Sequence, residues 1–266
     1  MKLTLTAPAK INLTLKVGER LPNGYHDINT IMQTVSLSDI ITLENTGLEG
    51  ITVTVSGQFS EGVPTDDRNI CVKAARLFVK DGLHIHIEKN IPHGAGLGGG
   101  SSDAAAVLIG LASIKGEVDP GQLELAAMNL GADVPFFIRG GLRLCTGIGF
   151  DLSDTDYDWG VAEPRIVIAM GQERISTARA YEILDRAGSD SFDSCITSPE
   201  IEDIKRLMKD ASKVSLSGSG AAVYGIFPRS EIKRIQSLKK NLRAGGYFCE
   251  ICEPVAYGGK VTWAQI

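Results

Sequence analysis

The segment Gly94–Gly100 constrains this chain more than any other part of its sequence, because five of its seven residues are glycine. Glycine loses more backbone entropy on folding than any other residue, so a dense cluster indicates a sharp turn or a close approach of the main chain to another group. An alanine- and leucine-rich stretch follows and predicts a helix to about Lys115, with Ser101 or Ser102 as its N-cap. A helix N-terminus attracts anions through its free amides and its dipole. The segment therefore predicts a main-chain cradle for a polyphosphate.

This cradle differs from the two common phosphate loops. No Gly-Lys-Ser/Thr follows the glycines, as a Walker A motif requires, and the strand context and acidic residue of a dinucleotide fingerprint are missing from the sequence. The alternative is a flexible turn. A flexible turn, however, needs neither the preceding Pro92 nor a helix that starts at once.

Composition narrows the class of protein. The 266 residues are 43% hydrophobic and 22% charged, which is typical of a globular chain of one large or two modest domains. The net charge of -5 argues against a nucleic-acid or anionic-membrane partner. No apolar stretch approaches the ~18 residues of a membrane span, and the N-terminus alternates like a strand, so we expect a cytoplasmic protein. Cys249 and Cys252 have metal-site spacing but lack a second pair, which favours a structural role and predicts no metal site.

Hydrophobic periodicity predicts an α+β chain with two lobes. An acidic, aperiodic stretch at 151–164 indicates the boundary, which gives domains 1–154 and 155–266. The predicted strands are 3–17, 40–43, 51–55, 83–87, 135–138, 142–145, 165–169, 223–227 and 247–252, and the predicted helices are 69–80, 102–115, 120–130, 178–187, 198–210 and 230–242.

The glycine segment, read from Pro92 to Ala105, resembles the nucleotide loop of the GHMP kinases, the superfamily of galactokinase, homoserine, mevalonate and phosphomevalonate kinases. The triple glycine before Ser-Ser is most similar to the branch that phosphorylates 4-diphosphocytidyl-2-C-methyl-D-erythritol. Five further matches follow the order of that branch: Ala7-Pro-Ala-Lys-Ile-Asn-Leu13, Gly24-Tyr-His26, Asn69 with Ala74-Ala-Arg76, Gly131-Ala-Asp-Val-Pro-Phe136, and Ser217-Gly-Ser-Gly-Ala221.

The resemblance implies a two-lobed GHMP kinase fold, with an N-terminal α/β lobe like ribosomal protein S5 and a ferredoxin-like C-terminal lobe. It implies transfer of the γ-phosphate of ATP to the 2-hydroxyl of the cytidine diphosphate substrate, in non-mevalonate isoprenoid biosynthesis. Magnesium is expected with the nucleotide, because phosphoryl transfer needs a divalent ion on the phosphates. No carboxylate cage for that ion is visible in the sequence.

Lys10 and Asp133 are the catalytic pair that the resemblance implies. Transfer to an alcohol needs a carboxylate to take the hydroxyl proton and a cation to offset charge. Asp133 follows Gly131-Ala132 and precedes a proline, in a loop that allows a carboxylate to project into a cleft. Without the resemblance, each residue is also explained as a surface or capping charge.

The resemblance also implies the binding residues. Tyr25 would stack on the cytosine base, His26 would hydrogen-bond its edge, Tyr181 would close its other face, and Asn12 would hold the erythritol hydroxyls. An ordinary turn remains the alternative for Gly24-Tyr-His26 and for Ser217–Gly220, a helix cap for Asn69, and a solvated strand-end lysine for Lys89. The implied ATP-binding set is Pro92, His93, Gly94, Ala95, Gly96, Leu97, Gly98, Gly99, Gly100, Ser101, Ser102, Asn69 and Lys89, and the implied supporting loop is Ser217, Gly218, Ser219 and Gly220.

Two other functions stay open from sequence alone. One is a mevalonate- or homoserine-type kinase of the same superfamily, and the presence of Tyr25 and His26 argues against it. The other is a catalytically inactive nucleotide sensor with the same fold, and the presence of both Lys10 and Asp133 argues against it. A monomer and a homodimer are both compatible with the sequence.

Overall fold

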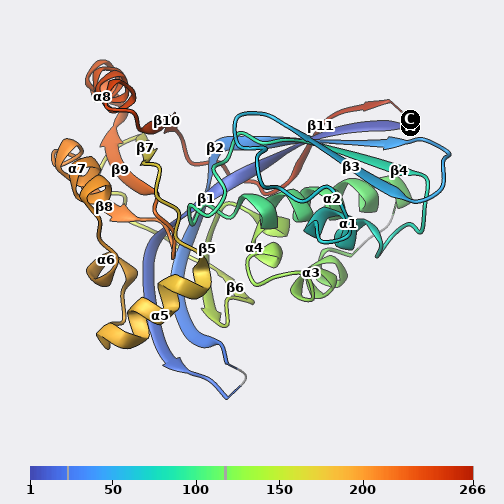
Figure 1. Cartoon of the computed structure of the whole chain (residues 1–266), viewed down its shortest axis with the longest axis horizontal. Helices are drawn as coiled ribbons and strands as arrows, with labels where there is room; N and C mark the ends of the chain where they lie inside the picture. Colours follow the sequence, from blue (N-terminus) through green and yellow to red (C-terminus); the bar gives the residue numbers. More distant parts are fainter. Residues whose placement is uncertain (23, 117–118, 266) are drawn as a thin grey trace.

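Two β-sheets with helices packed on them make up the molecule (Figure 1), in a computed structural model that describes residues 1–22, 24–116 and 119–265. The first sheet has seven strands, with the order β11-β1-β2-β4-β3 and with β5 and β6 continuing from β2. The second has four strands in the order β10-β7-β9-β8. The predicted α+β architecture is confirmed.

A long bent hairpin, β1 (Lys2–Arg20) and β2 (His26–Asn45), connects the two lobes. The alternating residues Leu3, Leu5 and Ala7 face the core of the first lobe, whereas Ala9, Ile11, Leu13 and Val17 belong to the core of the second. The pairing of β1 with β2 shifts register between Pro8 and Ala9 and again between Asn12 and Thr14. Such irregularities bend a strand and redirect its side chains. They bracket Lys10 and Asn12.

The first lobe places its helices on one face of its sheet (Figure 1). The elements are β3 (Ile51–Ser56), α1 (Ile70–Ala75), β4 (Leu83–Glu88), α2 (Gly99–Lys115), α3 (Pro120–Met128), α4 (Val134–Arg139), β5 (Leu142–Gly147), β6 (Asp151–Asp154) and β11 (Lys260–Gln265). Ala104, Ala105 and Ala106 of α2 are fully buried. Small side chains at these positions let the helix lie close to the sheet and to α1.

The second lobe contains a sheet in which every pair of neighbouring strands is antiparallel. Helices α7 and α8 pack on it, and α5 reaches back toward the β1–β2 hairpin (Figure 1). Its elements are β7 (Pro164–Met170), α5 (Thr177–Ala187), α6 (Phe192–Cys195), α7 (Pro199–Leu207), β8 (Lys213–Leu216), β9 (Val223–Pro228), the 3₁₀ turn Arg229–Glu231, α8 (Ile232–Ala244) and β10 (Phe248–Cys252).

Two local predictions are wrong. The expected strand 135–138 is the helix α4, which has proline in its first turn and buries Phe136 and Phe137 in the core. A short apolar run does not distinguish a buried strand from a buried helix. The expected serine cap of α2 is replaced by Gly98, which adopts a left-handed conformation with φ of 72° and makes no side-chain cap.

The proposed division at 154/155 falls between β6, the last strand before it in the first sheet, and β7 of the second sheet. The C-terminal strand β11 nevertheless pairs with β1 in the first sheet. A single cut therefore does not describe residues 260–265, and the domain division stays a prediction. Among the described residues, no helix has the length and apolar character needed to cross a membrane.

Candidate active site

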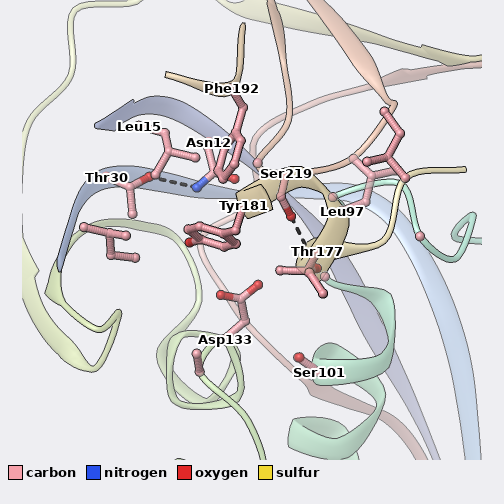
Figure 2. A pocket seen from close by; sticks show the side chains of 18 of the residues that line it. Asn12, Leu15, Thr30, Leu97, Ser101, Asp133, Thr177, Tyr181, Phe192 and Ser219 are labelled. Atoms are coloured by element: carbon pink, nitrogen blue, oxygen red, sulfur yellow. Dashed lines mark hydrogen bonds between the residues drawn. The ribbon is translucent and has the colours of Figure 1, made fainter. Parts of the chain in front are cut away.

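A cavity of about 890 Å³ lies where the two lobes meet. Three parts of the chain line it: the β1–β2 hairpin, the glycine segment from Pro92 to Ser101 with the nearby Asp133, and the second-lobe residues of α5 and of loop 218–219. Figure 2 shows side chains from all three parts pointing into the same space. The cavity contains most of the site residues predicted from sequence, and it is open to solvent.

The glycine segment is held from both sides by main-chain contacts. The Lys10 amide donates to the Leu97 carbonyl at 2.9 Å, and the Ala222 amide donates to the Ala95 carbonyl at 3.2 Å. The Ser217 hydroxyl donates to the Gly96 carbonyl at 3.0 Å. A Cβ on Gly96 would lie 1.9 Å from the Ser217 carbonyl oxygen, so only glycine fits there. The structure thus packs loop 217–220 directly on the glycine segment.

Helix α2 starts at the mouth of the cavity. The Ser102 amide bonds to the Gly98 carbonyl at 2.9 Å, so the amides of residues 99–101 precede the first intrahelical bond and have no acceptor within the helix. Ser101 lies on the cavity side of this first turn (Figure 2). Ser102, in contrast, is fully buried, and its hydroxyl oxygen has no hydrogen-bond partner. The start of α2 therefore has the geometry expected of an anion site at a helix N-terminus, and the serine that lines the cavity there is Ser101.

Lys10 and Asp133 meet in this cavity although 123 positions separate them in the sequence. The Lys10 ammonium lies 3.9 Å from an Asp133 carboxylate oxygen, with the lysine side chain 5% and the aspartate side chain 35% exposed. Asp133 precedes α4 but makes no capping bond, and its carboxylate points into the cavity (Figure 2). Burial lowers the pKa of Lys10, and the negative charge of Asp133 opposes that shift.

Asn12 fixes the position of the lysine. The Lys10 ammonium donates to the Asn12 side-chain oxygen at 2.5 Å, and the Asn12 amide nitrogen donates to the Thr30 hydroxyl at 2.8 Å. Thr30 in turn donates to the Thr14 carbonyl at 2.6 Å. The buried Tyr224 hydroxyl donates to the Asn12 main-chain carbonyl at 2.9 Å. Both lobes therefore hold the segment that carries the cation.

An aromatic group forms the far side of the cavity. The rings of His26 and Tyr181 stack at 4.8 Å with an interplanar angle of 19°, and Phe192 supports Tyr181 edge-on at 5.0 Å. The His26 Nε2 atom lies 2.8 Å from an Asp185 carboxylate oxygen. Because a carboxylate only accepts, Nε2 carries the proton, and in the neutral ring Nδ1 is then an acceptor. Tyr25 also lines the cavity and is 57% exposed.

Two residues predicted to bind nucleotide occupy structural positions. Asn69 caps α1: its side-chain oxygen accepts from the Cys71 amide at 2.9 Å, and its nitrogen donates to the Pro64 carbonyl at 2.7 Å. Lys89 is buried beneath the glycine segment between two carboxylates. The cap role considered for Asn69 matches its position better than contact with adenosine. The solvated strand-end role considered for Lys89 is wrong, because the residue is 3% exposed and is paired with two carboxylates.

Sequence reasoning missed Asp185, Thr30, Phe192 and Tyr224. Asp185 lies four positions after Tyr181 on α5, and residues with this spacing share a helix face, so the pattern offered one signal. The other three read as ordinary core or strand residues. Within the described ranges, no group of three or more His, Cys, Asp or Glu side chains is arranged to hold a metal ion.

Comparison with known proteins shows which family this chain belongs to. The model of the GHMP kinase N-terminal domain matches residues 69–141, and that of the GHMP kinase C-terminal region matches residues 178–243. A 4-diphosphocytidyl-2-C-methyl-D-erythritol kinase from Caldicellulosiruptor saccharolyticus is 39% identical over 261 residues, which cover 85% of this chain and 88% of that relative. This chain belongs to the GHMP kinase family.

Solved structures agree with this GHMP kinase fold. A crystal structure of a 4-(cytidine 5'-diphospho)-2C-methyl-D-erythritol kinase matches with a TM-score of 0.70 and 29% identity, and covers 95% of this chain and 99% of its own. A homoserine kinase from Cytophaga hutchinsonii matches with a TM-score of 0.74 at 18% identity, covering 98% of this chain and 97% of its own, and that likeness concerns the fold alone. The predicted two-lobed GHMP kinase fold is confirmed. As a member of a small-molecule kinase family, the protein uses ATP as its phosphoryl donor.

Proposed function

We propose that this GHMP kinase transfers the γ-phosphoryl group of ATP to the 2-hydroxyl of 4-diphosphocytidyl-2-C-methyl-D-erythritol, in non-mevalonate isoprenoid precursor biosynthesis. The observation that carries the proposal is the Lys10–Asp133 pair, which shares one cavity with the first turn of α2 and with the aromatic group of His26 and Tyr181. The curated relatives with this name match along most of the chain.

The geometry supports an in-line transfer. The amides at the start of α2 hold the phosphates of ATP, and Asp133 accepts the proton of the acceptor hydroxyl as its oxygen attacks the γ-phosphorus. The bond from that phosphorus to the bridging oxygen breaks, and ADP leaves with the electron pair. Lys10 offsets the negative charge that develops on the transferred group, and its burial strengthens that interaction.

Magnesium fits the oxygen groups at this site. The Asp133 carboxylate and the Ser101 hydroxyl both line the cavity beside the first turn of α2. Hard oxygen ligands suit magnesium, which keeps several waters and binds largely through the nucleotide phosphates. When bound, the ion would neutralise phosphate charge during transfer.

The aromatic residues of the cavity support a cytidine substrate. Tyr181 and Tyr25 offer ring faces for stacking, which every base accepts. Selection therefore depends on hydrogen bonds. With Nε2–H donated to Asp185, the Nδ1 lone pair of His26 would accept from the exocyclic amino group of cytosine and would repel the carbonyl oxygen that uracil has in its place.

The wider setting is also part of this proposal. We propose that the enzyme acts in the cytoplasm on free metabolites, as a monomer or homodimer. The net charge of -5 supports partners other than nucleic acids and anionic membranes.

A substrate panel tests the proposal. The purified protein is incubated with ATP, magnesium and either 4-diphosphocytidyl-2-C-methyl-D-erythritol, mevalonate or homoserine, and ADP release and the ³¹P spectrum of the product are recorded. We expect a new phosphomonoester with the cytidylyl compound alone. Turnover of mevalonate or homoserine without the cytidylyl compound would assign a different kinase, and ATP binding without ADP formation on any alcohol would indicate a sensor.

A further inference from the structure

A buried cluster of three charged side chains lies under the phosphate cradle. The Lys89 ammonium contacts a carboxylate oxygen of Asp39 and lies 2.7 Å from an Asp103 oxygen. The three residues come from β2, from the segment after β4, and from α2, and none is more than 3% exposed. Burial of charge at this level is unfavourable unless the charges are paired and hydrogen-bonded, so the cluster needs a reason.

The cluster fastens the segment that leads into the glycine loop. The second oxygen of Asp39 accepts from the Asn90 amide at 2.5 Å and from the Ile91 amide at 2.8 Å. These residues precede Pro92, where the loop begins. Asp39 therefore fixes the entry to the loop, while Lys89 connects it to Asp103 inside α2.

The ammonium also lies directly against the first turn of that helix. A Cβ on Gly99, the first residue of α2, would be 3.2 Å from the Lys89 nitrogen. Asp103 is four residues further along, which is about one helical turn. The cluster thus holds both the entry to the loop and the turn whose amides face the cavity.

We propose that Lys89 is a positioning residue for triphosphate binding, which sets the first turn of α2 by joining Asp39 to Asp103 and does not touch the nucleotide. This role rests on the proposed use of the cradle for ATP. It differs from the adenosine contact that the sequence resemblance implied for Lys89. Its consequence is that Lys89 affects any ligand with a triphosphate, whatever base the ligand carries.

The charge state of the cluster adds a pH dependence. Burial and the charge of Asp39 outweigh the opposing effect of Lys89 and raise the pKa of Asp103 to about 8. Burial lowers the pKa of Lys89, but the two carboxylates together raise it above its ordinary value, so Lys89 stays charged. The Cys71 thiol of α1 also faces the cluster, and burial raises its pKa well above the ordinary value, so it stays neutral.

The sign of that dependence follows from counting charges. With Asp103 protonated, Lys89 and Asp39 cancel and the cluster is neutral. Above about pH 8 Asp103 loses its proton, and one net negative charge lies beneath the site of an anionic ligand. We therefore expect triphosphate affinity to fall as the pH rises through this range.

The test measures binding alone, without an acceptor alcohol, by titration calorimetry with ATP, GTP and inorganic tripolyphosphate. Lys89→Met should weaken all three by a similar factor, on the order of tenfold, because it leaves the buried carboxylates beneath the cradle without their cation. Lys2→Met removes an exposed lysine paired with Glu44 and should bind all three like the wild type. Loss of ATP affinity with unchanged tripolyphosphate affinity would overturn the proposal, since it would mean that Lys89 contacts the nucleoside.

Asp103→Asn keeps the test decisive if Lys89→Met does not fold. The asparagine still accepts from Lys89 but cannot titrate, so the loss of ATP affinity between about pH 7.5 and 9 should shrink relative to the wild type. Titration of Lys10 affects the wild type and the variant equally, so the difference between their pH profiles does not depend on it. An identical pH profile in the variant would contradict the proposal. If the wild-type protein binds no ATP at all, the proposed function itself fails, and that outcome is distinct from either result.

Discussion

Replacement of Gly96 by alanine tests how closely the glycine segment must pack on loop 217–220. Gly96 has φ of +78°, and a Cβ there would lie 1.9 Å from the Ser217 carbonyl oxygen and 2.8 Å from the Gly220 amide nitrogen. These neighbours are main chain and cannot rotate away. The two loops must therefore separate by roughly 1.5 Å before carbon and oxygen reach an ordinary contact distance.

The magnitude follows from two effects. A left-handed conformation costs a non-glycine residue about 1–2 kcal/mol. The separation also moves the first turn of α2 relative to Lys10, which is bonded through its amide to Leu97. A misplacement of about 1 Å lowers catalytic efficiency by about 10²-fold, so we expect kcat/KM of Gly96→Ala to fall by that order.

The assay combines steady-state kinetics with thermal unfolding, and Gly47→Ala is the matched control. Gly47 has φ of +65° with nothing within 4 Å of its Cβ position, so this variant has the backbone strain without the clash. Both variants should lose a few degrees of Tm, on the order of 2–4 °C per kcal/mol. Only Gly96→Ala should lose activity. A Gly96→Ala protein with kcat/KM within about threefold of the wild type would show that activity does not depend on this close packing of the two loops.

Three further predictions concern the cavity. Asp133→Asn should lower kcat by about 10²–10⁴-fold with little change in Tm, because the amide keeps the shape of the side chain but cannot accept the hydroxyl proton. Unchanged ADP formation would show that another group is the base. Because burial lowers the pKa of Lys10, activity should fall on the alkaline side at a pH below that at which an ordinary lysine loses its proton. Lys10→Arg should move this alkaline limb upward if the variant folds, and an unchanged limb would assign it to another group. Asp185→Ala should raise KM for the cytidine substrate by about tenfold and leave kcat nearly unchanged. The reason is that His26 loses the charged hydrogen-bond partner that fixes its tautomer and its stacking on Tyr181. An unchanged KM would show that Asp185 takes no part in base selection.

Sequence alone reached the local features of this site. The glycine segment and the start of the following helix are neighbours in the sequence. Local helix propensity and the helix dipole were therefore sufficient to predict an anion cradle there. The expected serine cap was wrong, because α2 begins at Gly99, directly after a left-handed Gly98, and has no side-chain cap. The same arguments also misread residues 135–138, whose burial in a helix depends on the surrounding core.

Contacts between distant residues were beyond reach of pattern reasoning. The proximity of Lys10 to Asp133 followed from the family resemblance and not from spacing, and no periodic signal links Asp39, Lys89 and Asp103. Bringing such residues together depends on how β1 and β2 bend between two cores, which is a tertiary property.

A crystal structure of the complex with a non-hydrolysable ATP analogue and 4-diphosphocytidyl-2-C-methyl-D-erythritol would show the cradle and the base together. We expect the phosphates to lie on the amides at the start of α2 and the 2-hydroxyl to lie about 2.6–3.2 Å from an Asp133 carboxylate oxygen, with the Lys10 ammonium beside it. A complex in which the acceptor hydroxyl lies far from Asp133, or in which the phosphates bind away from the first turn of α2, would contradict this expectation.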